Sequence, residues 1–162
     1  MDRRLVVSVT ACAVVVVDQL VKLLVISRLA LHDVVEVVPG FFNLVHVRNP
    51  GAAFSILSDG GMVRTVFLVA VTAAALVVIA FLLRSATDRL TVAALSLVAG
   101  GAVGNLIDRL RFGEVVDFLD FHAGPYHWPA FNVADSAITV GVVLALSAHY
   151  LGGAESGEER RG

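Results

Sequence analysis

The stretch TVFLVAVTAAALVVIAFLL, residues 65–83, contains no charged residue and lies between Arg64 and Arg84. A helix needs about 20 mostly apolar residues to cross the hydrocarbon core of a bilayer, because each residue advances it by about 1.5 Å. The length and composition of this stretch therefore predict a transmembrane helix, and with it a membrane protein.

The composition of the whole chain supports this prediction. Its 162 residues are 57% hydrophobic and 16% charged, whereas about a quarter of the residues in a soluble domain are charged. The length suits one domain. The formal net charge of −2 gives no indication of nucleic-acid binding, and the sequence has no basic patch or interleaving of aromatic and basic residues that would predict it. Cys12 is the single cysteine, so an intrachain disulfide is excluded.

Three further segments are apolar enough and long enough to span a membrane. They cover residues 5–26, 90–107 and 131–150, and the first and last contain a few polar residues. The sequence therefore predicts an all-α membrane protein with four transmembrane helices in a single domain, residues 1–151. The glycine-rich, charged residues 152–162 are expected to form a flexible cytoplasmic tail.

Two longer connections lie between these helices. Residues 28–61 are rich in β-branched and aromatic residues around a Pro39–Gly40 turn, and they predict two or three short strands. We expect these strands to form a small extracytoplasmic β-sheet between the first two helices. Residues 108–130 mix apolar and charged residues and are expected to form a second outer loop.

The distribution of arginines predicts the orientation, because cytoplasmic loops are enriched in Lys and Arg. Six arginines fall on the side of the two termini and five on the other, but the six are concentrated in far fewer residues. This places both termini in the cytoplasm and both larger loops outside. The six are Arg3, Arg4, Arg84, Arg89, Arg160 and Arg161; the five are Arg28, Arg48, Arg64, Arg109 and Arg111.

Residues 9–12, VTAC, resemble the lipobox of a lipoprotein signal peptide. A mature lipoprotein turns polar after that cysteine, but AVVVV follows Cys12. We therefore interpret this segment as part of the first transmembrane helix.

Charged residues inside the predicted spans need an explanation, because each costs roughly 2.5–3.5 kcal/mol at the bilayer centre. Asp18 and Lys22 are four residues apart and share a helix face, which favours a structural ion pair. The alternative is that one of them faces a polar partner or substrate near the outer surface.

A second polar group ends the third predicted helix. Gly100 and Gly104 have the GxxxG spacing of closely packed helices. Asn105, Asp108 and Arg109 follow at a spacing that places them on one helix face. Structural support and contact with a substrate both remain open for these three residues.

Asp117, Asp120 and Asp135 are the remaining candidate acids. Asp117 and Asp120 suit a loop surface, and Asp135 suits the first turn of a helix capped by Asn132. However, the short loop between Asp117 and Asp135 can bring them together near the outer surface. Two carboxyls about 3 Å apart share one proton. One can then accept a proton from water while the other protonates a carbonyl oxygen.

Five motifs resemble one family, the bacterial lipoprotein signal peptidases (signal peptidase II). In chain order they are DQLVK at 18–22, RNPGAAFSIL at 48–57, GGAVGNLIDRL at 100–110, GEVVDFLDFH at 113–122 and PAFNVADSAITVG at 129–141. The resemblance covers residues 18–141 and is specific because all five occur in order.

The resemblance implies an intramembrane aspartyl endopeptidase of the bacterial inner membrane, with its site near the outer face. Its substrates are diacylglyceryl-modified prolipoproteins, cut just before the lipidated cysteine. The resemblance implies Asp117 and Asp135 as the catalytic dyad, and no metal or organic cofactor. It also implies membrane lipid as a partner and cyclic peptides as inhibitors. The residues implied to bind substrate or support the site are Asp18, Lys22, Asn49, Asn105, Asp108, Arg109 and Asn132.

Two other functions were weighed against this one. A transporter or proton relay would use buried acids as a polar path, but the second helix is wholly apolar and the acids cluster toward one side. An assembly protein would use the GxxxG motif but leaves the paired acids unexplained. The family does not require an acid at Asp120, which we interpret as incidental. The five histidines lack a metal-binding spacing.

Overall fold

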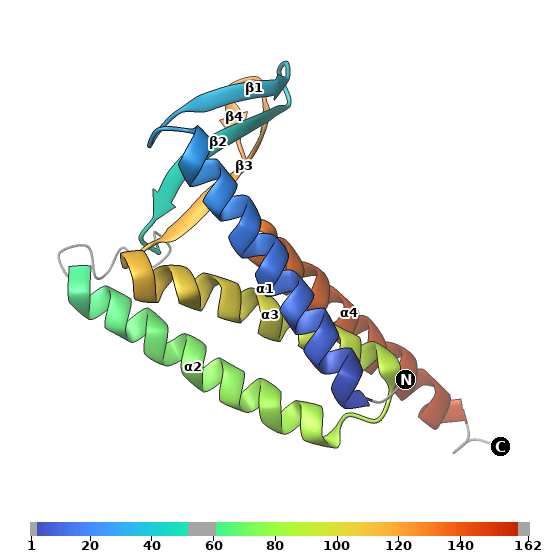
Figure 1. Ribbon diagram of the computed structural model, residues 1–162. Helices are drawn as coiled ribbons and strands as arrows, with labels where there is room; N and C mark the ends of the chain where they lie inside the picture. Colours follow the sequence, from blue (N-terminus) through green and yellow to red (C-terminus); the bar gives the residue numbers. More distant parts are fainter. Residues whose placement is uncertain (1–2, 52–60, 159–162) are drawn as a thin grey trace.

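The computed structural model describes residues 3–51 and 61–158, and contains four helices and a small sheet (Figure 1). The helices are α1 (Arg3–Arg28), α2 (Gly61–Ser85), α3 (Arg89–Phe112) and α4 (Val133–Glu158). The strands are β1 (Val34–Val38), β2 (Phe42–Asn49), β3 (Val115–Ala123) and β4 (Tyr126–His127). The sheet lies at one end of the helical bundle, beyond the C-terminal end of α1.

The helices have the surface of a membrane-spanning bundle. Within the described residues, Leu5–Arg28, Gly61–Ser85 and Arg89–Phe112 are long and apolar enough to cross a bilayer, and Val133–His149 is a shorter apolar helix. The outward side of α2 is apolar: Val66 is 58% exposed and Phe81 61% exposed. Side chains of this kind are stable on an outer surface when lipid covers them.

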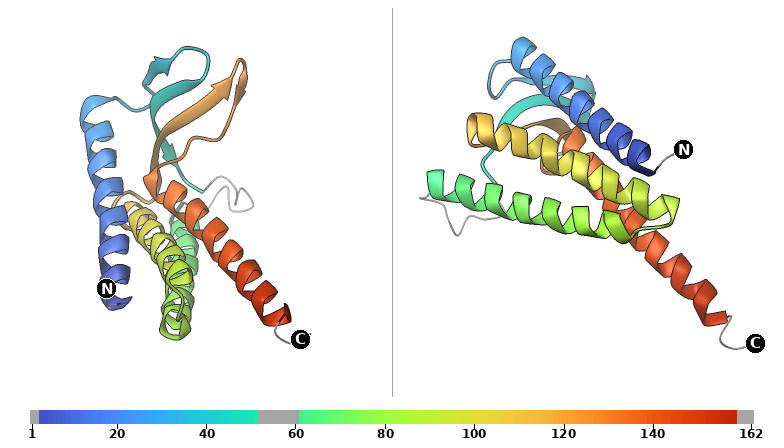
Figure 2. Two further views of the ribbon diagram at one scale, coloured as in Figure 1. Left: turned by 90° about the vertical axis from the view of Figure 1, so that its right-hand side faces the viewer. Right: turned by 60° about the horizontal axis from the view of Figure 1, so that its bottom comes forward.

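Helix α3 lies at the centre and packs against α1 and α4, while α2 packs mainly on α3 (Figure 2). Glycine residues on α3 allow α1 to pack closely against it. A Cβ atom at Gly100 would lie 2.9 Å from the carbonyl oxygen of Ala11 in α1, and one at Gly104 would lie 2.8 Å from Asp18 Oδ2. The GxxxG packing predicted from the sequence is therefore confirmed.

The sheet is antiparallel with strand order β1-β2-β3-β4. Residues 28–61 supply two strands, as predicted. The prediction that the sheet comes only from that segment is wrong, because β3 and β4 lie within the expected loop, residues 108–130. Strand β3 pairs with β2 from Phe42↔Phe121 to Asn49↔Val115. This pairing joins segments far apart in the chain, and no local pattern specifies it.

Helix ends also differ from the predicted ones. Helix α3 continues past residue 107 to Phe112 and stops where Gly113 adopts a left-handed conformation (φ 77°). Helix α4 continues past residue 150 to Glu158, so it includes residues 152–158 of the expected tail. Three glycines there, Gly152, Gly153 and Gly157, cost about 1 kcal/mol each, which does not suffice to end a helix. Residues 159–162 lie outside the described part of the chain.

Candidate active site

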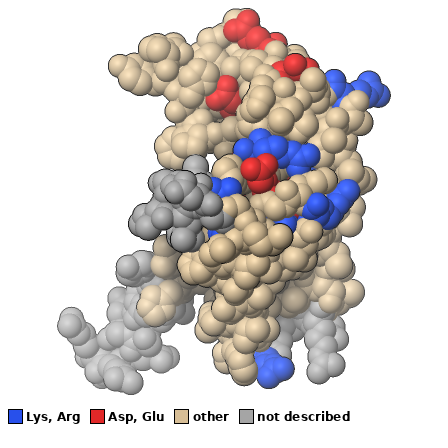
Figure 3. All heavy atoms as spheres, turned by 90° about the vertical axis from the view of Figure 1, so that its left-hand side faces the viewer, with Lys and Arg blue, Asp and Glu red and all other residues tan. Residues whose placement is uncertain are grey.

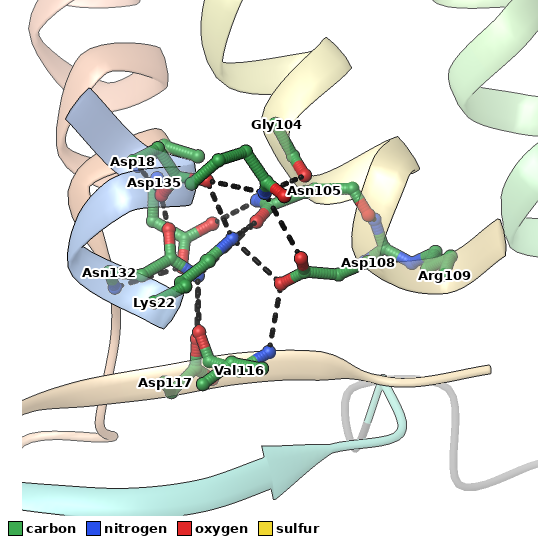
Figure 4. A network of polar contacts seen from close by, with 12 residues as sticks. Asp18, Lys22, Gly104, Asn105, Asp108, Arg109, Val116, Asp117, Asn132 and Asp135 are labelled. Atoms are coloured by element: carbon green, nitrogen blue, oxygen red, sulfur yellow. Dashed lines mark hydrogen bonds and ion pairs between the residues drawn. The ribbon is translucent and has the colours of Figure 1, made fainter. Parts of the chain in front are cut away.

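The polar residues predicted from the sequence meet where β3 passes the ends of α1 and α3 and the start of α4 (Figure 4). They come from distant parts of the chain. Helix α1 supplies Asp18 and Lys22, α3 supplies Asn105 and Asp108, β2 supplies Asn49, β3 supplies Asp117, and Asn132 and Asp135 lie at the start of α4. The rest of the Asn49 motif, residues 52–57, lies outside the described residues.

Asp117 is a buried carboxyl, with 1% of its surface exposed. Asn132 Nδ2 donates to its Oδ1 at 2.7 Å, and Asn49 Nδ2 donates to its Oδ2 at 2.9 Å. Burial and the charge of Asp135 outweigh these hydrogen bonds and raise the pKa of Asp117 to about 7. Asp117 is therefore suited to hold a proton at neutral pH.

Asp135 is half-buried in the first turn of α4. Its Oδ1 accepts a hydrogen bond from Asn105 Nδ2 at 2.7 Å, and its Oδ2 accepts a longer one, 3.3 Å, from the backbone N–H of Asn132. It also lines a cavity of about 560 Å³ whose other walls are mostly apolar, including Trp128 and Phe131. Asp135 therefore faces a space that can hold a substrate and a water molecule.

Asn132 connects the two aspartates. Its Nδ2 donates to Asp117, while its Oδ1 accepts from the backbone N–H of Asp135 at 2.9 Å. The second contact makes Asn132 the N-cap of α4, as the sequence predicts, and Asp135 Oδ2 in turn accepts from the backbone N–H of Asn132. One capping arrangement thus begins the helix and positions both carboxyls.

Lys22 is buried, with 2% of its surface exposed, and contacts Asn105, the residue that donates to Asp135. Its Nζ contacts Asp18 Oδ2 and Asp108 Oδ2, each at 2.8 Å, and donates to Asn105 Oδ1 at 3.0 Å. The predicted Asp18–Lys22 ion pair is present, and Asp108 completes it. An ammonium group only donates, so it holds the oxygen of Asn105 toward itself and turns Nδ2 toward Asp135.

The two acids paired with Lys22 also hold the backbone beside the dyad. Asp108 Oδ2 accepts from the N–H of Val116 at 3.1 Å, and Asp18 Oδ1 accepts from the N–H of Ala134 at 2.9 Å. Val116 precedes Asp117, and Ala134 precedes Asp135. The buried charges therefore position Asp117 and Asp135 through the residue that precedes each of them in the chain.

Gln19 belongs to this cluster, although it was not among the predicted site residues. Its Nε2 lies 3.1 Å from Asp108 Oδ1 and 3.2 Å from Asp18 Oδ2. The signal was present in the sequence, because an amide inside an apolar span requires a polar partner.

Arg109 follows Asn105 by one helical turn, as the sequence spacing predicts, but it is more exposed than Asn105 and Asp108. Asn105 and Asp108 are buried against α1, whereas Arg109 is half-exposed and lines a second cavity between α2 and α3. Its Nη1 donates to the carbonyl oxygen of Asn105 at 3.4 Å.

Asp120 lies on the opposite face of β3 from Asp117, because successive strand residues alternate between faces. Asn43 Nδ2 donates to Asp120 at 2.9 Å, and His127 Nδ1 lies 2.9 Å from it. Burial raises the pKa of Asp120, but the hydrogen bonds and charge of His127, with Asn43, outweigh it and leave the pKa below its usual value. Asp120 thus differs from Asp117 in both place and chemistry.

Known proteins are similar to this chain in sequence and in fold. The family model described as signal peptidase (SPase) II matches residues 10–151. A lipoprotein signal peptidase of Syntrophotalea carbinolica is 54% identical over 88% of this chain and 89% of its own length. That of Geobacter metallireducens is 51% identical over 85% of each chain.

A solved bacterial membrane enzyme has a similar fold, with a TM-score of 0.79 and 36% identity over 88% of this chain and 90% of its own. A second gives a TM-score of 0.78 and 34% identity, covering 89% of this chain and 87% of its own. The chain therefore resembles these proteins in both sequence and fold along most of its length. The chain belongs to the signal peptidase II family, whose named members are lipoprotein signal peptidases.

Proposed function

We propose that this protein is an aspartic endopeptidase that removes the signal peptide from diacylglyceryl-modified prolipoproteins by cutting before the lipidated cysteine. The observation that carries the proposal is the pairing of Asp117 and Asp135 through one side chain, Asn132, at the edge of a cavity. Membership of the signal peptidase II family supports the substrate class.

The two carboxyls have different environments, which suits acid–base catalysis. Asp117, with its raised pKa, holds the shared proton, and the more exposed Asp135 accepts a proton from water. The hydroxide that results attacks the scissile carbonyl carbon while Asp117 protonates the carbonyl oxygen. Collapse of this intermediate breaks the C–N bond: one of its hydroxyls returns a proton to Asp117 as the carbonyl re-forms, and the proton on Asp135 passes to the leaving amine.

Asn49 and Arg109 are the candidates for hydrogen bonds to the substrate. Asn49 already contacts Asp117, and Arg109 lines the cavity next to α2. A donor aimed at the developing oxyanion stabilises it more than it stabilises the ground-state carbonyl. These two side chains therefore complete the proposed site.

In the proposed membrane arrangement all four helices span the inner membrane, both termini are cytoplasmic, and the sheet and active site lie at the outer face. The position of Asp135 in the first turn of α4 supports a shallow site that water can reach from outside. The lipid chains of the substrate can then remain in the bilayer while the scissile bond enters the site. A transporter is less well supported, because the buried charges gather in one network where β3 passes the helices (Figure 4).

The test is cleavage by the purified full chain in lipid or detergent. Two prolipoprotein substrates with the same sequence are compared, one with and one without the diacylglyceryl group on the lipobox cysteine. We expect cleavage of the modified substrate at the bond before the cysteine, with kcat/KM at least about 10²-fold above that for the unmodified one, since the lipid chains add apolar contacts. Equal cleavage of both would refute the proposed substrate class.

Asp120→Asn is expected to retain most of this activity. Asp120 contacts Asn43 and His127 on the far face of β3 and has no contact with the dyad residues. We expect kcat/KM within about threefold of wild type, with any loss arising from the weakened contact to His127. An inactive, folded Asp120→Asn protein would show that the dyad has been assigned to the wrong acid.

A further inference from the structure

Arginine side chains gather beside the cavity between α2 and α3. Arg64 at the start of α2 and Arg109 near the end of α3 line it, and Arg48 and Arg111 flank the neighbouring ring of Phe112. We call the four arginines the arginine cluster. Figure 3 shows basic side chains grouped on this face around an acidic one. Glu114 lines the same cavity.

The cluster holds more positive charge than its surroundings neutralise. The ion pairs found among the described residues involve Lys22 and His127, and none involves these arginines. Arg48 Nη1 and Arg64 Nε are buried atoms with no hydrogen-bond partner in the described part of the chain. A buried donor left without a partner costs about 1–3 kcal/mol. An anionic ligand would relieve that cost.

Arg48 and Arg111 lie against the same aromatic ring. Their Cζ atoms are 4.2 Å and 4.8 Å from the centroid of Phe112. The two guanidinium groups are therefore at most 9.0 Å apart, the sum of those distances. Both remain charged at any ordinary pH, so they repel each other, and an anion near them removes that repulsion.

The cavity beside the cluster is apolar along most of its wall. It has a volume of about 630 Å³ and is lined by Met62, Val66, Val69 and Leu110 in addition to the two arginines. Thr65 Oγ1 donates to the carbonyl oxygen of Gly113 at 3.0 Å and holds the start of α2 against the end of α3. A charged end and an apolar body match a ligand with an anionic head and a hydrocarbon chain.

The arginine cluster also lies at the membrane depth expected for the headgroups of such ligands. Arg64 is near the first residue of one candidate span, Gly61–Ser85, and Arg111 is near the last of another, Arg89–Phe112. The ends of spanning helices lie at the lipid headgroups. Guanidinium groups bind phosphate with paired hydrogen bonds.

We propose that the arginine cluster binds the phosphate of an anionic phospholipid, one of whose acyl chains lies in the cavity against Val66 and Val69. This inference goes beyond the proposed peptidase function, and it is tested at Arg64 and Arg111 because Arg109 is also a candidate for substrate contact. It also explains why the sequence places almost as many arginines on the predicted outer side as on the cytoplasmic side.

The test is thermal unfolding of the detergent-purified full chain while phosphatidylglycerol is added. Phosphatidylcholine with the same acyl chains and inorganic phosphate are tested at equal concentrations. We expect the melting temperature to rise with phosphatidylglycerol, because a ligand that binds the folded state stabilises it. Phosphatidylcholine and inorganic phosphate should each cause a much smaller rise. An equal rise with phosphatidylcholine would exclude charge recognition, and an equal rise with inorganic phosphate would exclude a lipid ligand.

Variants locate the site. Arg64→Gln and Arg111→Gln should each weaken phosphatidylglycerol binding by about 10-fold, since each removes one charged contact to phosphate. Arg28→Gln is the matched control, because Arg28 is exposed on the same predicted side but away from the cavity, and it should bind like wild type. Val69→Trp should weaken phosphatidylglycerol binding by filling the cavity. Wild-type affinity in both arginine variants and in Val69→Trp would refute the proposal.

Discussion

Asp117→Asn is expected to abolish prolipoprotein cleavage while the protein stays folded. An amide cannot donate and recover the proton that the mechanism requires, so kcat/KM should fall by about 10⁴-fold or more. The fold should tolerate the change, because the amide has nearly the same shape and its oxygen can still accept from Asn132 Nδ2. Single-turnover cleavage and a melting curve measure the two effects separately.

Asp135→Asn is the paired variant and should be equally inactive, whereas Asp120→Asn serves as the active control. The dependence of wild-type activity on pH adds an independent measurement. The pKa of Asp117 is raised from 3.8 to about 7, so the neutral form that protonates the carbonyl oxygen is lost as the pH rises through about 7. Activity should therefore decline above that pH. Substantial cleavage by folded Asp117→Asn would exclude its role as a catalytic acid.

Lys22→Met is expected to have the largest effect on stability, lowering the free energy of unfolding by about 3–5 kcal/mol. The substitution leaves Asp18 and Asp108, which are 0% and 1% exposed, as two buried carboxylates without a countercharge. It also frees the Asn105 amide to rotate away from Asp135. Unfolding in mixed micelles measures the stability, and cleavage by the remaining folded protein measures the positioning effect.

Arg28→Met is the matched control, because it removes a charge from an exposed position at the end of the same helix. It should change stability by no more than about 0.5 kcal/mol. The double variant Lys22→Met with Asp108→Asn should be more stable than Lys22→Met alone, because it contains one fewer unpaired carboxylate. If the double variant is no more stable, unpaired charge is not the cause of the loss.

Local sequence patterns were sufficient to predict the helices. The apolar segments are as long as a bilayer is thick, and their hydrophobicity does not depend on what they pack against. The glycine spacing in α3 and the capping of α4 by Asn132 also follow from neighbours in the chain. The helix ends were less accurate, because hydrophobicity ends with the lipid while hydrogen bonding continues to Phe112 and Glu158.

Predictions about the sheet and the surroundings of the site were less complete. Residues 108–130 mix apolar and charged residues, so the sequence alone suggests a loop. The pairing with β2 shows that part of this segment is strand β3. The alternation of side chains along β3 then places Asp117 and Asp120 on opposite faces. Gln19 was not predicted, although an amide inside an apolar span signals a polar partner; that Gly104 and Asp108 on α3 are two of its partners follows only from the fold.

The sequence by itself determined that this is a membrane protein of the signal peptidase II type and which acids form its candidate dyad, because both inferences rest on segment length and ordered motifs. Only the tertiary structure showed that Lys22 orients Asn105 and that Asp18 and Asp108 hold the backbone beside the dyad. Those contacts join residues up to 116 positions apart. They exist because a buried charge requires partners, and the fold alone decides which groups lie within reach.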